Sequence, residues 1–298
     1  MRVKKTLTIS AVAMTAAIIM GGCAAGTDDA GSPEATDEAL FEVATDVTLE
    51  GSPTYDAMVA ADSVRIGVKE DQPNFGFLDA STGERSGFDV DIARWIAASL
   101  GFDEDKIEFQ AIPSSNRESA LVNGDIDYYV GTYSITDPRK EQVDFAGPYF
   151  VSGQGLLVAA DNDTIESKDD LGADTTACSV TGSTPLANLR RDYPDIKTVE
   201  FDTYSQCIES LNDGQVDVIT TDQAILAGYV QQSPDTLKIV GESFSTENYG
   251  VGLPKGDDAL RGFVNDLLTE GGDTWTAIFD ANLSESGLTA DQPEVDAY

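Results

Sequence analysis

Two kinds of hydrophobic pattern alternate along the chain from about residue 62 onward. Short runs of β-branched and other apolar residues are typical of strands, and apolar residues that recur every three or four positions are typical of amphipathic helices. The first series predicts strands at 64–68, 107–110 and 128–130, with helices at 90–100 and 116–123. The second predicts strands at 176–180, 198–201, 216–220 and 237–240, with helices at 185–191, 204–211 and 223–231. This alternation indicates an α/β protein built around mostly parallel sheets.

Extended segments stand on either side of the second series. They cover residues 149–159 and 243–253, and two more helices are predicted after them, at 258–268 and 274–283. The residues after 284 have no clear pattern, so we expect them to form a loose tail. The patterned part of the chain is long enough for two modest lobes.

The N-terminus has a different character. Three basic residues precede an apolar run over residues 7–20, and two glycines and Cys23 follow it. This order is typical of a secretory signal, and the run is too short to span a bilayer. Cys23 resembles the acylated Cys of a lipobox, although Met20 stands where Leu is usual; the alternative is an ordinary signal with an incidental Cys. Residues 23–61 are rich in small and acidic residues and lack Lys and Arg, so we expect an acidic flexible tether there.

The charge of the chain is strongly negative. It has 18 basic and 53 acidic residues, a formal net charge of −35. Such a surface repels nucleic acid and anionic lipid, which we exclude as partners, and it fits a solubility adaptation. The chain has no His, and therefore lacks the commonest general base and metal ligand. It also lacks phosphate-binding loops and the common metalloprotease and nucleophile motifs, so we expect no cofactor and no metal.

The three cysteines suggest one disulfide. If Cys23 is acylated, Cys178 and Cys207 remain as a pair, and an exported protein meets an oxidising compartment. A bridge between them would stabilise the fold by about 3–4 kcal/mol in the chain-entropy model. The alternative is two buried free thiols.

The segment 87–100, GFDVDIARWIAASL, is the most specific string in the sequence. A glycine and two acidic residues on alternate positions lead into a helix with apolar residues at helical spacing. The string resembles the signature of the family 3 extracellular solute-binding proteins, the polar amino acid receptors of ABC importers. This resemblance implies a two-lobed periplasmic-binding-protein type II fold, with a ligand cleft between the lobes and two hinge strands.

The resemblance covers about residues 62–283 and implies a division of the chain. The expected parts are a lipoprotein signal peptide (1–22), the tether (23–61), the first part of lobe 1 (62–155), lobe 2 (156–243), the return to lobe 1 (244–283) and the C-terminal tail (284–298).

Two segments are similar to those with which the family binds the ligand's α-carboxylate. The first, GTYSITDPR at 131–139, follows a strand, and the resemblance places Thr132, Ser134 and Arg139 on the ligand. A guanidinium suits this task because it forms two parallel hydrogen bonds to a carboxylate. The alternative for Arg139 is a position on the surface, in a helix-capping loop. In the second, TGSTP at 181–185, we expect Thr184 to cap a helix, and the resemblance assigns Ser183 and Thr184 to the same carboxylate. Capping alone would also explain that segment.

Three more residues complete the expected site. Asp222 stands at a strand-to-helix junction, where the family binds the ligand's ammonium group; a helix-capping role is the alternative. Lys69 and Arg117 resemble the basic residues of members that bind acidic amino acids, and would address the distal carboxylate. Two cations disfavour a basic ligand because burying like charges together is costly. Arg117 could instead pair with Glu118 or Asp125 on the surface.

The resemblance is nearest to the glutamate-binding lipoproteins of actinobacteria. It implies a monomeric receptor, anchored through Cys23 at the extracellular face of the membrane, that delivers glutamate to a membrane permease. Glutamine, aspartate or another polar amino acid is the alternative ligand. A sensor without transport, or an enzyme of the dehydratase type on the same fold, are alternatives from other classes.

Overall fold

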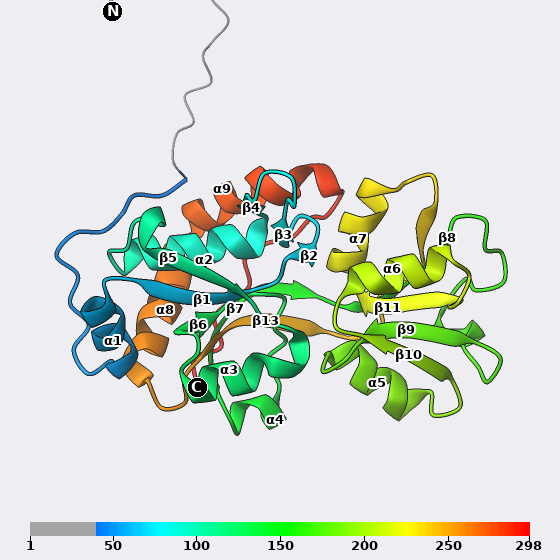
Figure 1. The fold of residues 1–298 in the computed structure, drawn as a ribbon, viewed down its shortest axis with the longest axis horizontal. Coiled ribbons are helices and arrows are strands. Elements are labelled where there is room, and N and C mark those ends of the chain that lie inside the picture. Colours follow the sequence, from blue (N-terminus) through cyan, green and yellow to red (C-terminus); the bar gives the residue numbers. More distant parts are fainter. Residues whose placement is uncertain (1–39) are drawn as a thin grey trace, which may run out of the picture. The chain divides into compact units, whose positions relative to one another are not determined.

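The computed structural model describes residues 40–298, which contain two five-stranded sheets (Figure 1). The first has the order β5-β1-β6-β13-β7, and only β13 runs antiparallel to its neighbours. Its strands are β1 (Val64–Val68), β5 (Ile107–Ala111), β6 (Tyr128–Tyr129), β7 (Asp144–Ser152) and β13 (Glu247–Leu253). A small antiparallel sheet lies beside it, formed by β2 (Asp71–Gln72), β3 (Gly76–Leu78) and β4 (Arg85–Ser86).

The second sheet has the order β10-β9-β11-β8-β12, and here β8 is the antiparallel strand. Its strands are β8 (Gln154–Ala159), β9 (Thr176–Val180), β10 (Lys197–Phe201), β11 (Val218–Asp222) and β12 (Leu237–Val240). The chain passes from the first sheet to the second at Gly153 and returns through residues 241–246. We call the two sheets with their helices lobe 1 and lobe 2. The expected α/β fold with two lobes and two connecting strands is confirmed.

Helices cover both sheets. In lobe 1 they are α1 (Pro53–Ala61), α2 (Phe88–Ser99), α3 (Arg117–Asn123), α4 (Asp137–Lys140), α8 (Asp258–Glu270) and α9 (Gly272–Leu283). In lobe 2 they are α5 (Thr184–Asp192), α6 (Tyr204–Asn212) and α7 (Gln223–Gln232). Short 3-10 helices occur at η1 (Glu104–Lys106), η2 (Ser114–Asn116), η3 (Lys168–Asp170) and η4 (Ser284–Ser286). Among the described residues, no helix has the length and apolar character needed to cross a membrane.

Helix α2 shows why the signature segment has its sequence. Gly87 precedes the helix with φ 116°, and a Cβ there would lie 2.3 Å from the carbonyl oxygen of Phe75, so only glycine fits. The apolar positions Ile92, Trp95 and Ile96 are buried in the lobe 1 core. The helix is therefore fixed at its start by a glycine turn and along its length by packing.

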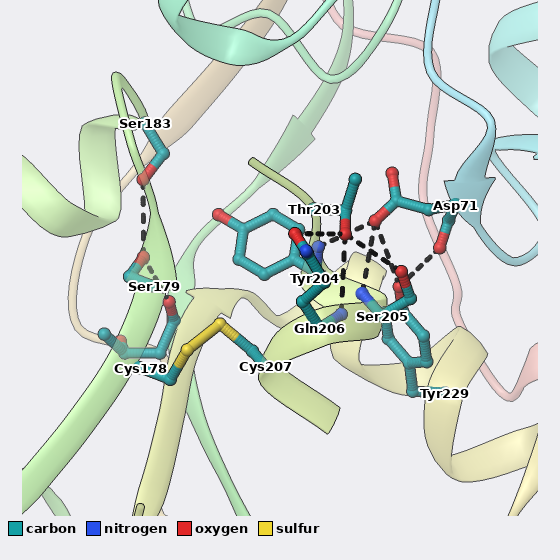
Figure 2. The surroundings of a disulfide bond; sticks show 11 residues. Asp71, Cys178, Ser179, Ser183, Thr203, Tyr204, Ser205, Gln206, Cys207 and Tyr229 are labelled. Atoms are coloured by element: carbon teal, nitrogen blue, oxygen red, sulfur yellow. Dashed lines mark hydrogen bonds between the residues drawn. A yellow bond between two sulfur atoms is a disulfide. The ribbon is translucent and has the colours of Figure 1, made fainter. Parts of the chain in front are cut away.

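A disulfide joins Cys178 of β9 to Cys207 of α6, as expected (Figure 2). Its Cα atoms lie 5.6 Å apart, and both residues are fully buried in the lobe 2 core. The bridge fixes α6 against the central part of the second sheet.

The expectation of a flexible tether over 23–61 is wrong for its described part, residues 40–61. Ser52 caps α1 by accepting a hydrogen bond from the N–H of Tyr55, and it donates one to Asp257. Tyr55 and Met58 are buried in the lobe 1 core, so this helix belongs to the folded part. The expected signal peptide, the rest of the expected tether and Cys23, which we expect to be acylated, lie outside the described residues.

The expectation of a loose tail over 284–298 is also wrong. Leu288, Ala290 and Val295 pack against the lobe 1 core. Tyr298 accepts a hydrogen bond from the N–H of Phe145 (2.9 Å), so the tail is held against β7. Its apolar residues find partners in the tertiary structure although they have no local period.

Candidate functional site

A cavity lies between the lobes, where strands end and helices begin. Lobe 1 contributes Gln72, Ser114, Arg117, Thr132 and Ser134, and lobe 2 contributes Ser183, Thr184, Pro185, Tyr204, Thr221, Asp222 and Ile225. Six of the predicted ligand residues therefore line it. The other two, Lys69 and Arg139, lie behind the lining residues.

Arg117 opens α3 and is 2% exposed. Its guanidinium lies over the ring of Tyr133 at 4.3 Å and donates to the carbonyl oxygens of Ser114 (3.1 Å) and Gly182 (3.2 Å). Among the described residues it forms no ion pair, and Glu118 instead pairs with Arg139. The surface-pair alternative therefore does not hold. A buried cation without a carboxylate partner is costly, and it can receive an anion from a ligand.

Lys69 is buried behind Ser114. Its ammonium group donates to the Ser114 hydroxyl at 2.8 Å. Burial, and secondly the charge of Arg117, lower the pKa of Lys69 to about 7. Lys69 therefore reaches the cavity through the serine hydroxyl and not directly.

Arg139 bridges the two lobes. Its guanidinium donates to the Ser134 carbonyl (2.7 Å) in lobe 1, and to the Thr184 hydroxyl (3.2 Å) and the Gly182 carbonyl (3.1 Å) in lobe 2. Burial, with the nearby charge of Arg117, lowers its pKa to about 10. Arg139 is not the surface arginine of the alternative, and it adjoins the cavity through Ser134 and Thr184.

Asp222 ends β11 and is 3% exposed. Its Oδ2 accepts a hydrogen bond from the Tyr249 hydroxyl at 2.7 Å, whereas its Oδ1 has no hydrogen-bond partner within residues 40–298. Burial, and secondly the charge of Glu247, raise its pKa to about 7. Asp222 precedes α7 but its side chain does not cap that helix. The unpartnered carboxylate oxygen suits a cationic group in the cavity.

Thr132 is held in an unusual backbone conformation, with φ 44°. Its N–H donates to Asp89 at 2.8 Å and its hydroxyl donates to Gln72 at 3.0 Å. Asp89 lies in the first turn of α2, is fully buried and also accepts from the Tyr149 hydroxyl (2.7 Å). The first acid of the signature thus positions a cavity residue, a role that the sequence reasoning missed.

At the start of α5 the structure corrects one detail. The cap is Ser183, whose hydroxyl accepts from the N–H of Leu186 at 3.2 Å, and the helix begins at Thr184. Because Ser183 provides the cap, the Thr184 hydroxyl is available to accept a hydrogen bond from Arg139 of lobe 1.

Several lining residues were not predicted as ligand contacts: Ser114, Pro185, Tyr204, Thr221 and Ile225. Each stands at a strand end or helix start, and that position was the available signal. Burial raises the pKa of Tyr204 to about 12, so its phenol stays neutral. Phe75, three residues after Gln72, lies in the lobe 1 core and does not line the cavity.

The cavity thus has a buried cation on one wall and an unpartnered carboxylate oxygen on the other, between two lobes joined by two strands. This arrangement defines a two-lobed receptor for small solutes that carry both charges. The chain belongs to the bacterial extracellular solute-binding proteins, family 3, whose model matches residues 64–280.

Relatives and solved structures agree with this assignment. The chain is 37% identical over 255 residues to the glutamate-binding protein GluB of Corynebacterium glutamicum, covering 81% of this chain and 85% of the relative. It is 36% identical over 265 residues to the glutamine-binding protein GlnH of an ABC transporter of Bacillus subtilis, covering 89% and 91%. The structure of a cysteine-binding protein from Campylobacter jejuni is similar with a TM-score of 0.75 and 30% identity, covering 81% of this chain and 98% of that one.

Proposed function

We propose that this protein is the substrate-binding component of an ABC importer, and that it binds glutamate in the cavity between its lobes. The observation that carries the ligand choice is Arg117, a buried guanidinium that lines the cavity without a carboxylate partner among the described residues. Asp222, on the facing lobe, supports an α-amino acid because its Oδ1 is buried and unpartnered within residues 40–298. Two relatives are named for binding glutamate and glutamine.

Different residues of the site bind different groups of the ligand. Asp222 binds the ammonium group, and Thr132, Ser134, Ser183, Thr184 and Arg139 bind the α-carboxylate. Arg117 binds the distal carboxylate, supported by Lys69 through the Ser114 hydroxyl. The contacts of Arg139 support this role. Its guanidinium already donates hydrogen bonds to Ser134 of lobe 1 and Thr184 of lobe 2, so a ligand carboxylate bound between these two residues would lie beside it.

The remaining assignments complete the proposal. The protein acts as a monomer, binds its ligand without transforming it, and passes it to a membrane permease. Its signal peptide ends before Cys23, which is acylated and anchors the protein at the extracellular face of the membrane. The expected division of the chain at 62–155, 156–243 and 244–283 is part of the proposal, and the crossings of the chain at Gly153 and within residues 241–246 support it.

Calorimetric titration tests the ligand. The purified protein is unfolded and refolded to remove any ligand carried through purification, and is then titrated with glutamate, glutamine, aspartate, asparagine and arginine. Tight binding of glutamate, with weaker binding of the neutral and basic amino acids, is expected. A preference for glutamine or arginine would refute the distal-carboxylate assignment, and binding of none of the five would refute the receptor function.

A further inference from the structure

One residue of lobe 1 meets two helices of lobe 2 next to the cavity. Asp71 is on β2, beside the cavity residue Gln72. Its Oδ2 accepts hydrogen bonds from the backbone N–H groups of Tyr204 (2.7 Å) and Ser205 (3.3 Å), as Figure 2 shows. Asp71 itself does not line the cavity.

The N-terminus of α6 is suited to receive this carboxylate. The first N–H groups of a helix have no acceptor within the helix and carry a partial positive charge. The capping residue Thr203 accepts from the N–H of Gln206 (3.4 Å), which leaves Tyr204 and Ser205 to Asp71. These two N–H groups are therefore satisfied across the gap between the lobes and not within lobe 2.

A second helix supports the same residue. The Tyr229 hydroxyl of α7 donates to the backbone carbonyl of Asp71 and lies 3.4 Å from its Oδ2. The adjoining segment is also in close contact with lobe 2, because Asn74 donates to the side chain of Gln231 at 2.6 Å. This loop thus makes one group of contacts between the lobes, and Arg117 and Arg139 make another.

We propose that Asp71 is the latch that holds the closed arrangement of the two lobes. It is a positioning residue: it keeps Tyr204, which does line the cavity, against the ligand without touching the ligand itself. The disulfide at Cys207, one turn further along α6, ties this helix to β9, so the latch holds the whole of lobe 2. The inference deepens the proposed function, since it assigns a residue that sets the affinity of the same cavity.

The latch predicts a uniform effect on ligands. In Asp71→Asn the volume is kept, but the charge-assisted hydrogen bonds to α6 become neutral ones. We expect the dissociation constants of glutamate and glutamine to rise by the same factor, about 10-fold, through faster dissociation. Tyr229→Phe removes the other contact and should act in the same direction, by about 3-fold. Glu70→Gln is the matched control, because Glu70 pairs with Arg85 inside lobe 1, and should change neither constant.

Amide hydrogen exchange measures directly whether Asp71 protects the N–H groups at the start of α6. With saturating glutamate, the N–H groups of Tyr204 and Ser205 should be protected in the wild type and exchange faster in Asp71→Asn, while that of Gln206 keeps its protection from Thr203. Unequal losses for glutamate and glutamine, or unchanged exchange at Tyr204 and Ser205, would overturn the latch. If the wild type binds no amino acid, the proposed function fails, and the same exchange comparison without ligand still decides for or against the latch.

Discussion

Substitution of Arg117 separates recognition of the ligand's distal carboxylate from recognition of its amino acid core. Arg117→Gln removes the positive charge while keeping a polar side chain of moderate size over Tyr133. The carbonyl oxygen of Ser114 loses its guanidinium donor, whereas that of Gly182 keeps the hydrogen bond from Arg139. The main loss is therefore the charge that faces the cavity.

The magnitude follows from the burial of this charge. Removing one partner of a buried, hydrogen-bonded ion pair costs about 2–5 kcal/mol, which is about 30- to 4,000-fold in affinity for glutamate. Glutamine presents a neutral amide, so its charge-assisted hydrogen bond to the guanidinium is exchanged for a neutral one, a difference of about 0.5–1.5 kcal/mol, about 2- to 13-fold. The affinity ratio of glutamate to glutamine should accordingly fall, by about 2-fold at the limits of these ranges and by more between them.

The assay is titration calorimetry of both ligands against wild type and variant. Arg94→Gln is the control: Arg94 also lies over an aromatic ring, Phe109, but it pairs with Asp91 and Glu104 away from the cavity. It should leave both affinities unchanged. Equal losses of glutamate and glutamine in Arg117→Gln would show that Arg117 does not contact the distal group, and would refute the reasoning.

Three further predictions follow from the structure. Asp222, with its pKa raised to about 7, must be ionised to bind an ammonium group, so the affinity for glutamine should be full above pH 7 and fall up to tenfold per unit as pH drops below it. Glutamate should bind most tightly near pH 7, because Lys69, whose pKa is lowered to about 7, loses its charge above that pH. Asp222→Asn should bind both ligands far more weakly and lose the dependence below pH 7 in the same titrations. Replacing both Cys178 and Cys207 with Ala should lower the free energy of unfolding by about 3–4 kcal/mol, measured in urea, because the bridge closes a loop across a sequence separation of 29. Gly228→Ala should weaken every ligand without lowering stability, since its Cβ would lie 2.5 Å from the carbonyl oxygen of Pro73 in the other lobe while alanine favours the helix; a wild-type affinity would contradict this.

The sequence predicted most of the fold because each strand and helix has its own hydrophobic pattern within a short stretch of sequence. The strands at 64–68, 176–180 and 237–240 match β1, β9 and β12 residue for residue. Two expectations were wrong for different reasons: that for residues 40–61 came from composition, and that for residues 284–298 from the lack of a local pattern. Residues 40–61 resemble a tether on average, yet Tyr55 and Met58 pack into the lobe 1 core. A helix that packs against the rest of the fold needs few residues of its own to stabilise it, here two buried side chains and one capping serine. The average composition of the segment does not show these three residues.

The sequence predicted where the site lies better than it predicted the contacts that its side chains make. Positions after strands and at helix starts identify the edge of a sheet, which is why six predicted residues line the cavity. Position does not determine how far a side chain reaches. Lys69 follows β1 as expected, but its ammonium group bonds the Ser114 hydroxyl. Asp89 lies in the first turn of α2, and the sequence of that helix gives no sign of its hydrogen bond to Thr132. Both depend on contacts between residues more than 40 positions apart.

The acidity of the chain and the basicity of its cavity give closure a particular importance. A net charge of −35 repels an anionic ligand at long range, and salt confines that field to about 8 Å under physiological conditions. Lys69, Arg117 and Arg139 provide an opposing local charge, all buried between the lobes. Charges out of water interact more strongly than exposed ones. In the proposed function, Gly182 and Thr184 of lobe 2 close over Arg117 and Arg139, so closure and recognition of a second carboxylate would be one event.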